Sequence, residues 1–297
     1  SLSFILFFTA VIYISRESPE TDLARADLHL YVNYWPPLQN LKQLQHAVEV
    51  QNAILLNIRI PHLDVVHVFL EASPEFTCRE LVHFMEARGA SFDAYRSRLA
   101  CTESSKQPTY FDMFMLAKNH TPAGHVAIVL NADMVFDHTL SILRNLAPRT
   151  VGVIATAGFS SEMPKDLMSE LKRLEPSLDI SKTLTNRCYD VKETERTSWD
   201  AFIFRPTELV FSLEAFLDES TQTPFPMNQN GAENSALNGL LSNNKDILTT
   251  QLCDFVKMWH IHFAEKMHHQ QSETFVNHAT SAPEIGHCSS ERTCLGH

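Results

Sequence analysis

The sequence predicts an α/β domain with a mostly parallel central sheet flanked by helices. Short apolar runs that are typical of buried strands alternate with longer segments whose apolar residues recur at helical spacing. This alternation indicates a parallel sheet with helices on its faces. The chain has 297 residues, of which 44% are hydrophobic, and this is enough for one large α/β domain or two small ones.

The strands are predicted from apolar runs and alternating patterns. Residues 126–130 (Val-Ala-Ile-Val-Leu) form an uninterrupted apolar run and give the best buried strand of the chain. Residues 28–34 alternate, and Trp35-Pro36-Pro37 ends that strand. The predicted strands are 28–34, 63–70, 126–130, 151–156, 199–204 and 252–263.

The helices are predicted from apolar residues at helical spacing and from start and stop signals. Pro74 begins one helix, and Gly89 is a suitable C-terminal stop for it. The predicted helices are 41–56, 74–88, 110–118, 140–146, 163–174 and 232–241. The polar segments 176–195 and 224–233 are predicted to be loops.

The two ends of the chain differ in character. Residues 2–14 carry no charge, but they are fewer than the roughly 20 apolar residues of a membrane span. Because the first residue is Ser rather than Met, we expect residues 1–15 to be a truncated signal-anchor or signal segment, with a buried strand or helix as the alternative. We expect a polar stem over 16–26 and a disordered tail, rich in His, Gln, Ser and Thr, over 265–297.

The charge and glycine content exclude several classes of protein. The net charge is −11, which argues against a nucleic-acid binder, since such a protein needs a basic face. A nucleotide ligand remains compatible with this charge, because a metal can neutralise its phosphates. The 8 glycines form neither GxxxxGK nor GxGxxG, so a P-loop and a dinucleotide fingerprint are both absent.

Two further features indicate a secretory protein. Asn119-His120-Thr121 is an N-glycosylation sequon, which predicts a glycoprotein. The six cysteines are an even number and could pair in an oxidising lumen, although the sequence leaves their pairing open.

Asp133 is the acidic residue at the end of the predicted strand 126–130. Ligands of open α/β sheets lie at the carboxyl ends of the strands. A carboxylate held there by a rigid strand suits a divalent cation that bridges a diphosphate. The alternative is that Asp133 starts a turn or caps the helix predicted near 139–145.

Four segments together carry a resemblance to a known family. They are Asn131-Ala132-Asp133, the run 198–206 with Trp199-Asp200, the run 225–227 followed by Gly231-Ala232-Glu233-Asn234, and Cys253 followed by Trp259-His260-Ile261-His262. This set resembles the nucleotide-sugar glycosyltransferases of GT-A fold over roughly residues 27–264, about four-fifths of the chain. The resemblance implies a single GT-A (Rossmann-like) domain over that range.

The metal-binding motif of this family departs from its usual form here. In the family an Asp-x-Asp-like motif ends a central strand and binds the ribose and, through a metal (Mn²⁺ or Mg²⁺), the diphosphate. Here it stands as Asn131-Ala132-Asp133, with Asn for the first Asp. The resemblance therefore implies Asp133 as the metal ligand and Asn131 as a sugar or ribose contact.

Two carboxylates are candidates for the catalytic base. The resemblance implies Glu233, because a positioned carboxylate can take the proton of the acceptor hydroxyl. Its alternative role is a first-turn acid favoured by the helix dipole. Asp200 is the rival base, and its alternative role is a structural carboxylate bonded to loop amides.

Other donor-site residues are assigned from position. His260 and His262 face the same side if 252–263 is a strand, and the resemblance implies that one of them, preferably His262, reaches the metal or diphosphate. Tyr31 and Asn33 end the first strand and are expected at the nucleotide wall, where Tyr31 stacks on a base or is simply a core residue. Asp112 is expected to line the donor pocket.

The function implied is a metal-assisted, inverting transfer of a sugar from a nucleotide-diphosphate donor to an acceptor hydroxyl of a glycan, protein or small molecule. The expected location is the Golgi or endoplasmic reticulum lumen, as a type II membrane protein held only by its N-terminal segment, or secreted. One alternative is a nucleotidyltransferase of similar fold, but Trp35-Pro36-Pro37 stands where its glycine-rich phosphate loop belongs. Another is a non-catalytic carbohydrate- or nucleotide-binding protein.

Overall fold

The computed structural model describes residues 25–35, 41–74, 76–89, 95–159, 163–176, 184–186, 199–218, 221–227, 231–261 and 286–287. The expected signal and stem segments therefore lie outside the described residues, apart from the last two residues of the stem. Most of the expected tail also lies outside them.

The central sheet is mostly parallel, as the sequence predicts. Its strands are β1 (Leu28–Tyr34), β2 (Val65–Glu71), β3 (Leu99–Ser104), β4 (Val126–Leu130), β6 (Thr150–Ile154), β9 (Ala201–Phe204), β10 (Leu248–Gln251) and β12 (Gly286–His287). Their order is β12-β10-β6-β9-β4-β1-β2-β3. Only β9 runs antiparallel to its neighbours among these described strands. The predicted fold class is confirmed.

A second, antiparallel sheet contains the strands that follow β4 and β6 of the central sheet. It contains β5 (Met134–Phe136), β11 (Met258–His260), β8 (Leu184–Asn186) and β7 (Thr156–Phe159), in that order. β5 follows β4 after a short turn, and β7 follows β6 directly. The carboxyl ends of β4 and β6 therefore lead directly into strands of the small sheet. The candidate site lies at this junction.

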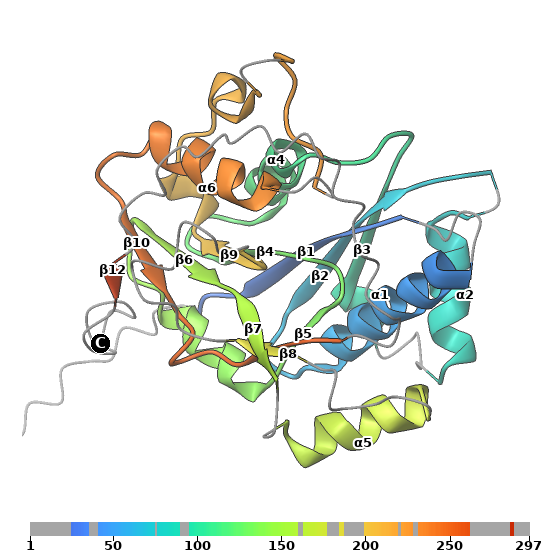
Figure 1. The fold of residues 1–297 in the computed structure, drawn as a ribbon. Coiled ribbons are helices and arrows are strands. Elements are labelled where there is room, and N and C mark those ends of the chain that lie inside the picture. Colours follow the sequence, from blue (N-terminus) through green and yellow to red (C-terminus); the bar gives the residue numbers. More distant parts are fainter. Residues whose placement is uncertain are drawn as a thin grey trace, which may run out of the picture.

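Helices cover both faces of the central sheet (Figure 1). α1 (Leu41–Arg59), α2 (Cys78–Ala87) and α5 (Lys165–Leu174) lie on one side, and α4 (Tyr110–His120) and α6 (Ala232–Ser242) on the other. Short 3-10 helices occur at Arg96–Arg98, His138–Asn145, Pro206–Glu208 and Leu213–Phe216.

The strand β4 shows why its sequence is apolar without interruption. Val126, Ile128 and Leu130 pack into the core on the α1 side. Ala127 and Val129 pack into the core on the α4 side. A strand buried on both faces needs apolar residues at every position, and the prediction of 126–130 matches β4 at both ends.

Two predicted helices differ from the observed ones in detail. The helix predicted from Pro74 begins at Cys78, because Thr77 caps it and Glu80 accepts a hydrogen bond from the Thr77 amide at 3.1 Å. Its predicted stop is confirmed, since Gly89 adopts φ +81°. The helix predicted at 140–146 is a 3-10 helix capped by Asp137.

Several strands were not predicted or were placed wrongly. The strand predicted at 252–263 is wrong in extent: the chain turns after Leu252, and within the described residues 252–261 only Met258–His260 is a strand. The loop predicted at 176–195 contains β8, and Gly286–His287 of the expected tail forms β12. β3, β5 and β10 are also additional strands. Edge or short strands such as Leu248–Gln251 carry no apolar period, so sequence alone does not reveal them.

The disulfides and the character of the helices complete the description of the fold. Cys78 and Cys101 form a disulfide that ties the start of α2 to β3, and Cys253 is disulfide-bonded as well. Within the described residues, none of the helices has the length and apolar character needed to cross a membrane.

We expect the Cys78–Cys101 disulfide to contribute measurably to stability. It closes a loop between residues 23 apart in sequence, and restricting the unfolded chain by such a loop is worth about 2–4 kcal/mol. The double variant Cys78→Ala/Cys101→Ala should lose about that much free energy of unfolding in urea titrations. An unchanged urea midpoint in the double variant would contradict this expectation.

Candidate functional site

The candidate site lies at the carboxyl end of β4, where the chain turns toward the small sheet. The Asn131 amide donates to the Asp200 carbonyl at 2.9 Å, and the Met134 amide donates to the Asn131 carbonyl at 3.3 Å. These bonds hold residues 131–133 in a fixed turn between β4 and β5. Asp133 therefore lies in a turn but does not cap the following helix, because Asp137 does.

Asn131 links two neighbouring elements through its side-chain amide. The Tyr110 hydroxyl, at the start of α4, donates to Asn131 Oδ1 at 3.1 Å. Asn131 Nδ2 donates to Asp200 Oδ1 at 3.1 Å. Both polar atoms of the Asn131 side chain are thus engaged inside the protein, and the expected role as a sugar or ribose contact requires that they also reach a ligand.

Asp200 is a buried carboxylate with both oxygens in use. Its Oδ2 accepts hydrogen bonds from the Thr156 amide at 2.6 Å and the Thr156 hydroxyl at 2.8 Å. Burial raises the pKa of Asp200, and the charge of Asp133 adds to the shift, although His260 and Thr156 oppose it. This geometry fits the alternative of a structural carboxylate bonded to loop amides. Asp200 therefore serves to position Asn131 rather than to act as a base.

Asp133 and His260 form a close pair. His260 lies at the end of β11, and its Nε2 is 2.7 Å from Asp133 Oδ2. Burial alone would lower the pKa of His260. The hydrogen-bonded Asp133, with Asp200 and Glu49 behind it, outweighs burial and raises that pKa. In this arrangement His260 orients the Asp133 carboxylate.

The structure adds two residues that the sequence analysis missed. His46 and Glu49 lie three apart on α1, and His46 Nδ1 is 2.8 Å from Glu49 Oε2. The ligand atoms of His46, Glu49 and Asp133 all lie within 4.8 Å of one another. The spacing of His46 and Glu49 on one face of the predicted helix 41–56 was the available signal.

This donor set fits a divalent cation. It offers one imidazole nitrogen and two carboxylates, which are ligands suited to Mn²⁺ and similar ions. A site made only of carboxylates, without the imidazole, would suit Mg²⁺ as well as Mn²⁺. The residues that could hold the ion are therefore Asp133, Glu49 and His46, with His260 behind Asp133 as its orienting partner.

Glu233 also lies in this region. It follows Gly231, which adopts φ +82°, in the first turn of α6. Burial, then the charges of Glu233 and Asp200, raise the pKa of Tyr110, so its hydroxyl stays protonated. Because Glu233 acts on Tyr110, and Tyr110 bonds Asn131, the fold brings Glu233 near the turn that carries Asp133.

The remaining expected donor residues have other surroundings. The Tyr31 ring is fully buried, stacks on the His67 ring with centroids 4.3 Å apart and bonds Thr121, which fits its alternative role as a core residue. Asn33 is also buried. Asp112 caps α4 by accepting from Thr109, which explains it without a donor pocket.

Ala132 is nearly buried in the turn between Asn131 and Asp133. Its expected contact with the donor stays a prediction. His262, the preferred metal-binding histidine of the sequence analysis, lies outside the described residues.

A small aromatic depression lies beside the site. Its cavity volume is only about 10 Å³, and Tyr110, Phe216, Phe225 and Ala232 are among the residues that line it. Ligand pockets usually measure about 300–1,000 Å³. This depression is therefore too small for a whole nucleotide sugar, and a donor would have to lie over the turn at Asp133 instead.

Comparison with known proteins gives partial likenesses in structure only. No protein-family model matches the sequence and no curated protein matches it. TarS 1-349 of S. aureus overlaps with a TM-score of 0.38 at 10% identity, covering 72% of this chain and 55% of TarS; it has also been solved with UDP-GlcNAc. GalNAc-T7, solved with UDP, GalNAc and Mn²⁺, overlaps with a TM-score of 0.35 at 10% identity, and the overlap covers 73% of this chain and 41% of GalNAc-T7.

A third neighbour is 4-diphosphocytidyl-2C-methyl-D-erythritol synthase from Anaerococcus prevotii. Its TM-score is 0.29 at 6% identity, and the overlap covers 48% of this chain and 60% of that protein. The chain thus spans less than two thirds of the length of each of these three proteins. Overlaps of this extent are partial, so the chemistry of the site has to rest on its own residues.

We expect that restoring the usual Asp at position 131 destabilises the protein. Asn131→Asp would set a half-buried carboxylate against the buried Asp200 where Asn131 now donates to it, at a cost of about 1–3 kcal/mol. The free energy of unfolding from urea titrations measures this loss.

The paired exchange provides the control. Asn131→Asp/Asp200→Asn reverses the amide and the carboxylate and restores one donor and one acceptor, so it should recover most of the loss. Equal stability of the Asn131→Asp variant and the unmodified chain would contradict the role of this hydrogen bond.

Proposed function

We propose that this protein is a metal-assisted glycosyltransferase that takes its sugar from a nucleotide-diphosphate donor. One observation carries the proposal: Asp133, at the carboxyl end of β4, meets His46 and Glu49 of α1 in a set of ligand atoms within 4.8 Å. This is the edge of an α/β sheet at which ligands bind.

The charge of this region favours a cation. Three carboxylates influence His260 electrostatically, namely Asp133, Asp200 and Glu49. Asp133, Asp200 and Glu49 are all buried. Buried carboxylates need compensating positive charge, and a divalent ion bridging to a diphosphate would supply it.

The transfer step follows from the groups at hand. The cation, when bound, offsets the negative charge that develops on the leaving diphosphate. Glu233 takes the proton of the acceptor hydroxyl while that oxygen bonds to the anomeric carbon. The bond from that carbon to the diphosphate oxygen breaks with its electron pair leaving on the diphosphate, and attack from the opposite face inverts the anomeric centre.

The other residues hold the reacting groups in place. His260 fixes the direction of the Asp133 carboxylate through their 2.7 Å contact. Asp200 and Tyr110 hold Asn131, and thereby the turn that carries Asp133. Asp200 is therefore a positioning residue in this proposal.

We also propose that the protein works in the lumen of the secretory pathway. The Cys78–Cys101 disulfide supports this, because disulfides persist in oxidising compartments. The exposed sequon residue Asn119, at the end of α4, is compatible with it.

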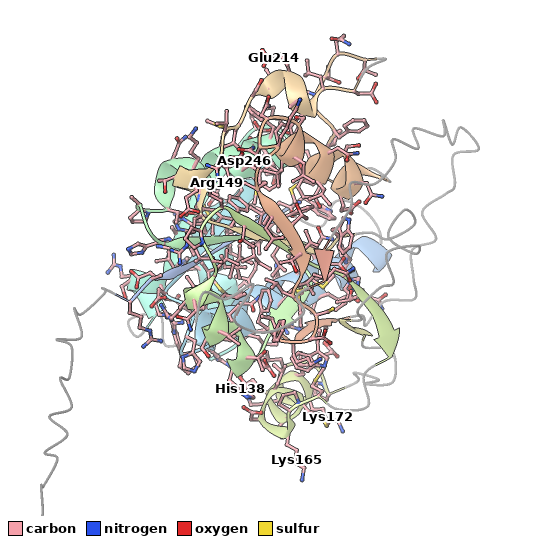
Figure 2. All side chains as sticks on the ribbon, turned by 90° about the vertical axis from the view of Figure 1, so that its left-hand side faces the viewer. His138, Arg149, Lys165, Lys172, Glu214 and Asp246 are labelled. Atoms are coloured by element: carbon pink, nitrogen blue, oxygen red, sulfur yellow. A yellow bond between two sulfur atoms is a disulfide. The ribbon has the colours of Figure 1, made fainter. Side chains whose placement is uncertain are left out.

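Binding and turnover with Mn²⁺ test the proposal. Nucleoside diphosphates should raise the melting temperature only when Mn²⁺ is present, since a ligand of the native state stabilises it, and a panel of nucleotide sugars should yield hydrolysis of one donor. Asp133→Asn should abolish both effects. Asp246→Asn is the matched control, because Asp246 lies at the surface, paired with Arg149 (Figure 2).

Two results would contradict this proposal. One is the absence of any shift or hydrolysis across the panel, which would favour a non-catalytic protein. The other is full activity of Asp133→Asn. Release of inorganic diphosphate from a nucleoside triphosphate would instead identify a nucleotidyltransferase.

Glu233→Gln should separate catalysis from binding. Loss of a general base lowers kcat about 10²–10⁴-fold, whereas the Mn²⁺-dependent thermal shift with the nucleotide should remain. Glu214→Gln, at an exposed position (Figure 2), should leave kcat unchanged. A kcat of Glu233→Gln within threefold of that of the unmodified chain would exclude Glu233 as the base.

A further inference from the structure

A second group of metal-ligating side chains lies at the opposite end of the central sheet. Asp27 and His29 are two residues apart at the start of β1, so they lie on the same face of that strand. Leu28 pairs with Val126 of the parallel β4, and the Val126 amide donates to the Asp27 carbonyl at 3.0 Å. This register sets His125 beside Asp27.

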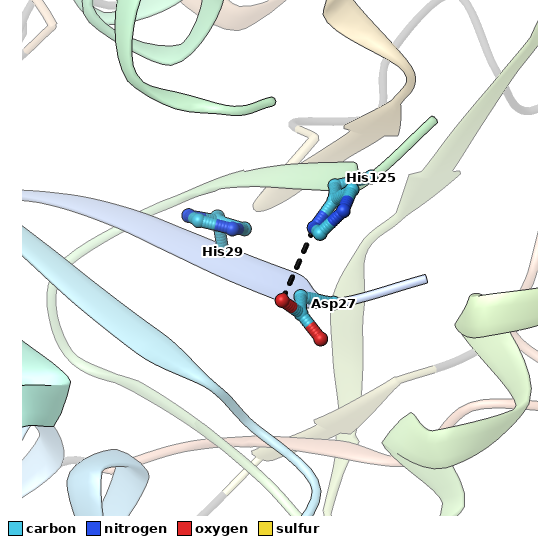
Figure 3. Close-up of side chains that lie close together, drawn as sticks. All are labelled: Asp27, His29 and His125. Atoms are coloured by element: carbon cyan, nitrogen blue, oxygen red, sulfur yellow. Dashed lines mark ion pairs between the residues drawn. The ribbon is translucent and has the colours of Figure 1, made fainter. Parts of the chain in front are cut away.

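The side chains of these three residues converge (Figure 3). Their ligand atoms all lie within 4.8 Å of one another. His125 Nδ1 is 3.2 Å from Asp27 Oδ2. Two ligands bound to Zn²⁺ at about 2.0–2.2 Å in tetrahedral geometry lie about 3.4 Å apart, so the spacing of this pair already suits a shared ion.

The contact between Asp27 and His125 does not by itself satisfy the histidine. His125 Nδ1 is shielded from solvent, and among the described residues it makes no aligned hydrogen bond despite its short distance to Asp27. A buried ring nitrogen without a hydrogen bond is costly. A metal ion between the two side chains would use that lone pair.

The charges around the three side chains favour a bound cation. Arg144 contacts Asp27 at 3.9 Å and Asp64 at 2.7 Å, which leaves two carboxylates against one guanidinium. His29 Nδ1 lies 3.2 Å from His67 Nε2, and this hydrogen bond holds the His29 ring in place.

We propose that Asp27, His29 and His125 bind a divalent transition metal ion of the zinc class. Two imidazoles and one carboxylate are the ligand types of zinc sites that keep a fourth position for water. The side chain of Asp27 is 47% exposed and that of His125 is 25% exposed, so the ion can enter from solvent and hold a water molecule. Binding would tie the start of β1 to the start of β4.

This site is separate from the candidate transferase site. Asn131 lies six positions after His125 along β4, which corresponds to about 20 Å. The two sites share no residue. Zinc binding here therefore stands or fails independently of the transferase chemistry.

Zinc titration of the purified chain after treatment with EDTA tests the proposal. All proteins are titrated in an Asp133→Asn background, which disables the candidate transferase site, so that zinc reports on the Asp27 site alone. In that background the chain and the control variant His138→Gln should bind zinc with equal affinity; His138 lies at the surface (Figure 2). Asp27→Asn and His125→Gln, both at partly exposed positions that should fold normally, should each weaken zinc binding at least tenfold. Co²⁺ in place of zinc should give the intense visible bands of a four-coordinate ion.

The contrary results are equally specific. Unchanged zinc affinity in either Asp27→Asn or His125→Gln, with circular dichroism confirming that the variant is folded, would overturn the proposal. Failure of the stripped chain to take up zinc would do the same, as would a six-coordinate Co²⁺ spectrum.

Discussion

The buried carboxylate of Asp200 is the constraint on which the site depends. Its Oδ1 accepts from Asn131 after β4, and its Oδ2 accepts from Thr156 after β6. Its backbone is bonded to Asn131 and Ile154 as well. A charge buried this deeply is tolerated only when each oxygen has a partner, so the ends of β4, β6 and β9 cannot separate without exposing it. Asp133 owes its fixed position to this junction.

The two ends of the central sheet differ in chemistry because parallel strands place like ends together. At the carboxyl ends, the Asp133 carboxylate of the turn after β4 meets Glu49 and His46 of α1, and His260 of β11 contacts Asp133. At the amino ends, Asp27, His29 and His125 gather in the register of β1 and β4. One sheet can thus offer two cation sites of different ligand type, an oxygen-rich one and a nitrogen-rich one.

The sequence predicted the frame of the fold and part of the site. The apolar run 126–130 revealed β4 to the residue, because a strand buried on both faces leaves a continuous apolar signal. The alternation over 28–34 did the same for β1. The motif around Asp133 and the helix start at Ala232 were also visible. His46 and Glu49 were missed, since nothing local to α1 indicates that it crosses the turn after β4. The two roles considered for Tyr31 could not be separated, because a core tyrosine and a base-stacking one look alike in sequence.

The sequence by itself therefore determined the α/β class, the buried strands and the acidic turn at Asp133, since these follow from periodicity and from residues close together in the chain. Only the tertiary structure decided which side chains meet. Asn131 and Asp200 are 69 residues apart, and Asp133 and His260 are 127 apart. Such pairs form because β9 inserts antiparallel between β4 and β6 and β11 pairs with β5. Long-range pairing of this kind is set by packing of whole elements, which no local pattern records.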